Sequence, residues 1–287
     1  MNNFFKKLFS PLISMKLITN KCNPVLLYHS LGKTSKFNKI DHVNLETLNS
    51  QLSFIKKYWK FVSIDEYANA KSKKGIASVT IDDGYKNVIV ESLKVFKNLN
   101  IPVTIFINSS TFDGKIFWRD KVRYLIENNL VNKYIKKSEI FNFVHTSNFY
   151  SISKNPEFNS KTVENEIDNF LLEEKINLTN IYNLCFDDSK YLINDSLISY
   201  GNHTCNHYLL SSLSKQEQYD EIIKCKNFIK KQNINKSEVF SIPFGGKKSF
   251  NSDTLSALSD LNYKIILNSS NNLDKNDISN EINRFMP

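Results

Sequence analysis

Two features of this 287-residue chain predict an α/β fold with a mainly parallel sheet or barrel. Short apolar runs rich in β-branched residues alternate with segments whose apolar residues recur at helical spacing. Strands joined by crossover helices run parallel within one sheet. A hydrophobic content of 41%, with 21 Phe and 13 Tyr, supplies a large core and argues against disorder.

The expected elements alternate along the chain. Strands are expected at residues 24–30, 61–64, 77–81, 102–108, 197–200, 239–242 and 263–267. Helices are expected after Asn44, over 88–96, over 215–231, where Ser214 and Glu217 form a capping box, and over 253–259. The stretch from 117 to 190 is less regular and richer in Asn, Lys and Glu. We interpret it as a helical insertion in a domain that spans residues 23–287.

The formal net charge of +9 suggests an anionic partner. However, the lysines are scattered in short pairs and triplets, and arginine, which suits bidentate phosphate contacts, occurs only at Arg119, Arg123 and Arg284. This distribution indicates a solvated surface, so no nucleic-acid partner is expected. The four cysteines lack CxxC spacing and are interpreted as free thiols of a reducing compartment.

Residues 1–22 form a basic amphipathic segment. No uninterrupted apolar run in it reaches spanning length and no small-residue cleavage site follows, so neither a transmembrane helix nor a standard signal peptide is predicted. Two alternatives stay open: residues 1–20 lie on an anionic membrane face, or they dock on the protein itself. We expect a cytoplasmic protein, either free or peripheral to the inner membrane face.

Two adjacent carboxylates, Asp82 and Asp83, follow the strand expected at 77–81 and precede Gly84. A strand that ends in a turn needs one polar residue at most, so the second suggests a chemical role. In parallel α/β folds, ligands and catalytic groups gather at the carboxyl ends of the strands. The structural alternative is that one carboxylate caps a helix and the other faces water.

A histidine pair, His203 and His207, follows the strand expected at 197–200. On a helical turn, this spacing places both imidazoles on one face, where a carboxylate from the aspartate pair would complete a divalent-metal site. Cys205 lies between them and is interpreted as a packing residue. The alternative roles are a helix cap and a surface group.

A third cluster follows the strand expected at 239–242. Pro243, Phe244, Gly245 and Gly246 make a rigid, open turn whose backbone amides can face a ligand. Taken alone, this segment predicts only a turn.

In order and spacing, the three clusters resemble the polysaccharide deacetylase family (NodB homology, carbohydrate esterase family 4). The resemblance covers most of the chain from Pro24 onward, and the run ending in Tyr28 and His29 is similar to one branch of the family. It implies a distorted (β/α) barrel of about seven strands. It also implies a hydrolase that removes N-acyl groups, most often N-acetyl, from amino sugars in surface-polysaccharide metabolism with a bound divalent metal.

Matching residues imply roles in that reaction. Asp82 matches the general base and Asp83 a metal ligand, with His203 and His207 completing the set around zinc, or around cobalt, nickel or manganese. Many members of the family use a histidine late in the chain as the acid for the leaving amine, but none follows His207 here. The resemblance of Tyr28 and His29 to the branch with an N-terminal Tyr-His implies that His29 is this acid. The alternative for His29 is a buried, hydrogen-bonded histidine.

The substrate-contacting residues are expected in the third cluster and among nearby aromatics. The backbone N–H of Phe244, beside Gly245, is expected to stabilise the oxyanion. Tyr85, Trp118 and Phe244 form either an apolar platform for the sugar or part of the core.

One position departs from the family pattern. Ser241 stands where the family often has an arginine that pairs with the base, and Arg284 or Arg119 is the expected substitute. Other functions therefore stay open: a deacylase of a small amide, a cyclic amide or an O-acetyl ester, or a non-catalytic glycan-binding relative. The expected partner is a carbohydrate, free or lipid-linked, and the sequence does not determine the sugar or the oligomeric state.

Overall fold

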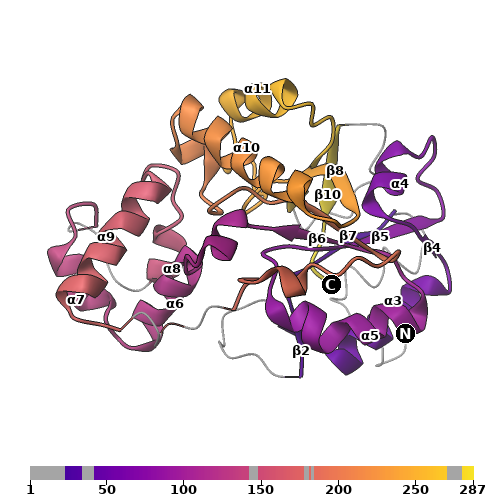
Figure 1. Cartoon of the computed structure of the whole chain (residues 1–287), viewed down its shortest axis with the longest axis horizontal. Coiled ribbons are helices and arrows are strands. Elements are labelled where there is room, and N and C mark those ends of the chain that lie inside the picture. Colours follow the sequence, from indigo (N-terminus) through magenta and orange to yellow (C-terminus); the bar gives the residue numbers. More distant parts are fainter. Residues whose placement is uncertain (1–22, 34–41, 142–147, 178–180, 182–183, 270–279) are drawn as a thin grey trace.

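A computed structural model describes residues 23–33, 42–141, 148–177, 181, 184–269 and 280–287 (Figure 1). Residues 1–22 lie outside the described residues, and with them both alternatives for this segment, a membrane contact and docking on the protein itself. No helix in the described part of the chain is long and apolar enough to cross a membrane. Cys185, Cys205 and Cys225 are buried free thiols.

Seven parallel strands form a nearly closed barrel, which confirms the predicted fold. Their order around the barrel follows the chain, and β10 returns beside β1, where Leu27 N–H donates a hydrogen bond to Phe285 O at 2.8 Å. The strands are β1 (Val25–Tyr28), β5 (Ile76–Ile81), β6 (Val103–Ile107), β7 (Ile198–Asn202), β8 (Lys236–Ser241), β9 (Ile266–Ser269) and β10 (Glu281–Arg284).

The predicted strand at 61–64 is wrong in its second half. Strand β4 (Lys60–Phe61) pairs with β5 but stops there, because Ser63 and Glu66 form a capping box that starts helix α4 (Ile64–Asn69). Two short strands that were not predicted, β2 (Ser30–Gly32) and β3 (His42–Asn44), pair outside the barrel sheet.

Helices cover the barrel on two sides (Figure 1). On one side lie α3 (Leu45–Lys56), capped by Asn44, and α5 (Leu93–Leu99), which continues a π-helical turn at Val88–Ser92. On the other side lie α10 (Lys215–Lys231), which begins at the predicted capping box, and α11 (Ser252–Asp260).

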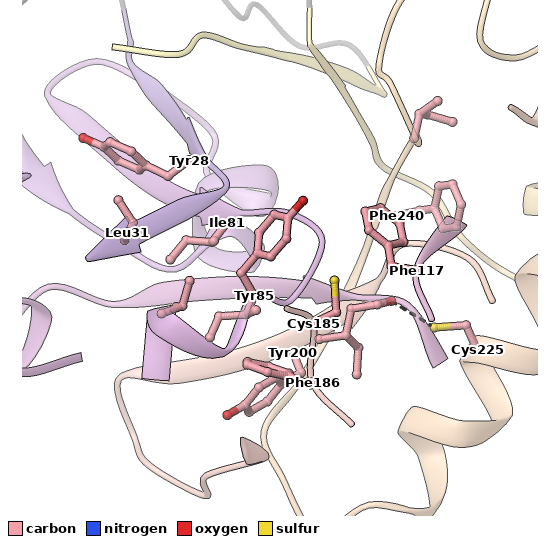
Figure 2. Close-up of a cluster of buried hydrophobic side chains, with 14 of the residues drawn as sticks. Tyr28, Leu31, Ile81, Tyr85, Phe117, Cys185, Phe186, Tyr200, Cys225 and Phe240 are labelled. Atoms are coloured by element: carbon pink, nitrogen blue, oxygen red, sulfur yellow. Dashed lines mark hydrogen bonds between the residues drawn. The ribbon is translucent and has the colours of Figure 1, made fainter. Parts of the chain in front are cut away.

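In the described part of the segment between β6 and β7, four α-helices gather at one end of the molecule (Figure 1). These are α6 (Trp118–Glu127), α7 (Val131–Lys137), α8 (Phe149–Ile152) and α9 (Ser160–Glu173). One hydrophobic core runs from barrel residues such as Val79 and Ile105 to Tyr134 and Phe170 of these helices. Figure 2 shows part of it, with Tyr85 after β5 and Phe117 before α6. Burial of this apolar surface therefore holds α6 and α8 against the barrel.

Candidate active site

Backbone geometry aims the polar residues at the carboxyl ends of the strands. Asp83 and Gly84, directly after β5, have φ values of 69° and 64°. Left-handed conformations also occur at Thr204, His207 and Phe244, in the loops after β7 and β8. Such backbone costs energy for residues other than glycine and clusters at functional sites.

Asp82 is held by Arg284, one of the two arginines suggested for this position. The guanidinium donates to Asp82 Oδ1 and Oδ2 at 2.8 and 2.7 Å, and the Ser241 hydroxyl donates to Oδ2 at 3.1 Å. Arg284 Nη2 also donates to Ser241 Oγ at 3.0 Å, so Ser241 takes part in the same network. Arg119 instead donates to Ser153 and Tyr150.

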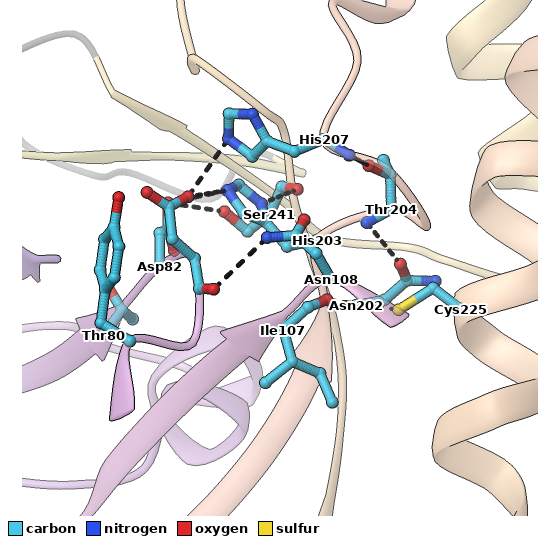
Figure 3. Close-up of polar contacts among 12 residues, drawn as sticks. Thr80, Asp82, Ile107, Asn108, Asn202, His203, Thr204, His207, Cys225 and Ser241 are labelled. Atoms are coloured by element: carbon cyan, nitrogen blue, oxygen red, sulfur yellow. Dashed lines mark hydrogen bonds and ion pairs between the residues drawn. The ribbon is translucent and has the colours of Figure 1, made fainter. Parts of the chain in front are cut away.

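Asp83, His203 and His207 converge on one point. Oδ1 of Asp83 lies 3.5 Å from Nε2 of His203 and 3.2 Å from Nε2 of His207, and all three residues are buried. Figure 3 shows both imidazoles close together beside Ser241. The predicted helical turn is wrong, because residues 203–207 form a loop and not a helix. Left-handed backbone at Thr204 and His207 brings the rings together instead.

These three side chains fit a divalent metal ion. The Ser241 backbone oxygen can only accept, so Nδ1 of His203, 2.9 Å away, carries the proton and Nε2 presents a lone pair. Oδ1 of Asp83 has no hydrogen-bond partner among the residues that the structure describes. Four tetrahedral ligands at about 2.1 Å from zinc are about 3.4 Å apart, close to the two observed separations. Asp83, His203 and His207 are therefore suited to binding a zinc ion.

The charges of the four residues follow from burial and pairing. Burial raises the pKa of Asp82, but Arg284 and His203 outweigh it, so the pKa lies below its ordinary value. Asp83 shows the same balance more strongly, with His207 and His203 holding its pKa well below the usual range. Burial lowers the pKa of His207 to about 4, so this imidazole is neutral at pH 7. The pKa of His203 is raised, because Asp82 and Asp83 outweigh its burial.

His29 lies directly after β1 and is partly buried. It lines the same cavity as the two aspartates and the two other histidines, and its charge helps to lower the pKa of both carboxyl groups. Its Nδ1 has no hydrogen-bond partner among the described residues.

The cavity has a volume of about 160 Å³, and only some of the predicted substrate residues line it. Tyr85 and Phe244 do, but Trp118 and Gly245 are not part of its lining. Trp118 is buried and donates from Nε1 to His207 O at 3.0 Å, so it supports a predicted ligand and is not a sugar platform. A larger cavity of about 960 Å³, beside α9 and α10, contains none of the predicted site residues.

The cavity lining also includes three cationic residues and a tyrosine that were not predicted to touch a ligand: Arg119, Arg123, Lys154 and Tyr150. They come from α6, α8 and the turn after α8. Arg119 and Arg123 did carry a signal in the sequence, because arginine is rare in this chain and the two lie one helical turn apart.

Paired carboxylates and two histidines at the carboxyl ends of the strands of a parallel barrel are an arrangement that suits a hydrolytic enzyme. The profile of the polysaccharide deacetylase family matches residues 69–266, and the chain belongs to this family. It is accordingly a deacetylase of glycans, a hydrolase acting on carbon–nitrogen bonds. No curated protein sequence matches the chain.

Solved structures of deacetylases share the fold. IcaB from Ammonifex degensii aligns with a TM-score of 0.58 at 15% identity, covering 92% of this chain and 91% of that one. The Streptococcus pyogenes deacetylase PplD, in complex with acetate, gives 0.51 at 16% identity, with 92% and 91% covered. The BpsB deacetylase domain from Bordetella bronchiseptica gives 0.51 at 14% identity, with 93% and 96% covered. At these identities the likeness describes the fold alone.

Proposed function

We propose that this protein removes an N-acyl group, N-acetyl above all, from an amino sugar of a surface glycan in a metal-dependent reaction. The observation that carries the proposal is the convergence of two differently held carboxylates on one cavity. Asp82 is fixed by Arg284 and Ser241, whereas Asp83 faces two histidine nitrogens. One carboxylate is thus arranged for proton transfer and the other for binding a cation.

Asp83, His203 and His207 would hold the ion, with zinc as the proposed metal. When bound, the ion would polarise the acyl carbonyl and make water a stronger acid at neutral pH. The hydrogen bond from His203 Nδ1 to Ser241 O fixes the ring orientation and tautomer. Trp118, at the start of α6, donates to the backbone oxygen of His207 and so helps to position this second ligand.

The chain's own groups would move the protons. Asp82, kept ionised by Arg284, accepts a proton from the attacking water. His29, in the same cavity, donates a proton to the leaving amine. The backbone N–H of Phe244 has no acceptor among the described residues and is proposed as a donor to the oxyanion.

The test is acetate release from a panel of N-acetylated sugars, nucleotide sugars, chitin oligomers and O-acetylated sugars. Zinc-loaded wild type is compared with Asp82→Asn and His29→Ala, and the metal content of each protein is measured. Loss of a general acid or base lowers kcat by about 10²–10⁴-fold. The kcat of both variants should therefore fall by about 10²–10⁴-fold, while both proteins retain the metal. No release by wild type that holds one metal per chain would refute the proposal, and release from O-acetyl sugars alone would change it to an esterase.

A further inference from the structure

All three arginines of this chain serve the candidate active site, although Lys and Arg together number 38. Arg284 holds Asp82, and Arg119 and Arg123 line the cavity from α6. Arginine keeps its charge when buried and makes directional contacts with oxygen anions, whereas lysine serves well on a solvated surface. Arginine is thus confined to the surroundings of the cavity, whereas lysine supplies the other cations of the chain.

Arg119 is a buried cation without a carboxylate partner among the described residues. Its guanidinium lies 4.5 and 4.4 Å from the ring centroids of Trp118 and Tyr150, and it donates to Ser153 Oγ and Tyr150 O. Its Nε has no acceptor in the described part of the chain. Burial lowers the pKa of Arg119 to about 10, so the group is still charged at pH 7. A buried charge without a counter-ion is costly and suggests that a ligand supplies the anion.

Two neighbouring cations, Arg123 and Lys154, line the same cavity. Arg123 donates to Asp120 Oδ1 at 2.7 Å and to the Tyr85 hydroxyl at 3.1 Å, so a carboxylate offsets its charge. Lys154 is partly exposed, and its Nζ lies 5.1 and 5.6 Å from the rings of Tyr150 and Phe244. Lys154 therefore brings a second cation to the cavity wall that Arg119 lines.

The carboxylates that line the cavity do not balance the charge of Arg119. Asp82 is paired with Arg284, and Asp83 faces His203 and His207, where a divalent ion would more than offset its charge. With the ion bound, the cavity would carry net positive charge. Clefts lined by one sign of charge concentrate ligands of the opposite sign.

We propose that Arg119 and Lys154 form a subsite for an anionic group of the substrate, a carboxylate or a phosphate close to the acylated amine. This inference rests on the proposed function and specifies its substrate as an acidic amino sugar or a sugar phosphate. The cavity, about 160 Å³, is smaller than the roughly 300–1,000 Å³ of pockets that enclose drug-sized ligands. The anion and the acyl group consequently belong to the same sugar or to adjacent ones.

Binding tests the subsite without turnover. Glucuronate, glucose 1-phosphate and methyl glucoside, which carry no acyl group, are titrated into the full-length zinc-loaded protein by calorimetry at fixed ionic strength. At least one anionic sugar should bind about tenfold or more tightly than methyl glucoside, as expected for one charged hydrogen bond. If glucuronate binds more tightly than glucose 1-phosphate, the subsite prefers a carboxylate; the reverse order indicates a phosphate. Equal binding of all three sugars would overturn the inference.

Variants of the partly exposed Lys154 keep the test independent of folding. Lys154→Gln should remove about tenfold of the affinity for the anionic sugar, and Lys154→Arg should retain it. Lys236→Gln is the matched control, because Lys236 begins β8 at the opposite end from Ser241. Arg119→Gln should weaken anion binding further, provided that its melting temperature shows a folded protein. Equal losses for neutral and anionic sugars in Lys154→Gln would overturn the subsite.

Acetate release separates this inference from the proposed function. N-acetylglucosamine 1-phosphate, N-acetylglucosaminuronate and methyl N-acetylglucosaminide are compared as substrates of wild type. Anion-selective binding without acetate release from any of them would refute deacetylation and leave the subsite standing. Acetate release with equal kcat/KM for anionic and neutral sugars would refute the subsite and leave deacetylation standing.

Discussion

Replacing Arg284 with methionine tests whether this residue holds the proposed base. The substitution removes both hydrogen bonds to Asp82, at 2.8 and 2.7 Å, but keeps an apolar side chain of similar length. Arg284 is fully buried and Asp82 nearly so, which leaves an unpaired carboxylate in the barrel. Breaking one partner of a buried ion pair costs about 3–5 kcal/mol. We therefore expect a loss of that size in the free energy of unfolding at pH 7.

The pH dependence provides a second readout with a defined sign. In wild type, the pKa of Asp82 is below its ordinary value, so its stabilising contribution is present above about pH 4 and is lost as the pH falls through the folded-state pKa. In Arg284→Met, burial remains and the largest opposing charge is gone, so this pKa should rise above the ordinary value. The variant then gains stability as the pH falls from 7 toward 4, and its deficit relative to wild type narrows.

The assay is urea unfolding of metal-free wild type, Arg284→Met, Asp82→Asn and the double variant at several pH values. The double-mutant cycle should give a coupling energy of about 1–3 kcal/mol between the two residues. Lys97→Met is the control, because Lys97 pairs with Asp195 at an exposed position and its loss should cost less than about 1 kcal/mol. A cost below about 1 kcal/mol for Arg284→Met, or a stability deficit that widens as the pH falls, would show that Arg284 does not stabilise ionised Asp82.

Three further outcomes are expected. His203→Ala should abolish stoichiometric zinc binding in equilibrium dialysis, whereas retention of one tightly held ion would exclude His203 as a ligand. Because the raised pKa of His203 lets protons compete with the ion, zinc affinity of the wild type should weaken by about tenfold per pH unit below that pKa, and a flat profile from pH 8 to 5 would contradict this. Gly245→Ala should lower the unfolding free energy by at least about 1–2 kcal/mol, because φ at Gly245 is +63° and the added Cβ would lie 2.4 Å from Ser269 N. An unchanged midpoint of urea unfolding would show that the turn relaxes to accept the methyl group.

Local signals predicted most of the elements because they act within a few residues. Asn44 caps α3, and the box of Ser214 and Glu217 starts α10 where expected. The strand predicted over 61–64 was wrong at Ile64 because the capping box of Ser63 starts a helix there, and this local signal outweighs the β preference of isoleucine. Strand β10 was missed, although it places Arg284.

For the histidine pair, the sequence predicted the correct residues but the wrong backbone conformation. A spacing of four predicts neighbouring side chains on a helix, and His203 and His207 are indeed neighbours. Their loop reaches this arrangement through left-handed conformations at Thr204 and His207. Residue type does not predict such conformations in threonine and histidine, because their cost is offset only by surrounding tertiary contacts.

The reactive groups of this protein can be read directly from its sequence: adjacent carboxylates and a histidine pair, each following a strand of a parallel fold. The partner of each group depends on how the chain folds in three dimensions. Asp82 and Arg284 are 202 positions apart, and they meet because β10 closes the barrel beside β1. The sequence left Arg119 as an equal candidate, but a shared core holds α6 elsewhere on the cavity. Pairing over such separations depends on how strands and helices pack together, which local sequence does not encode.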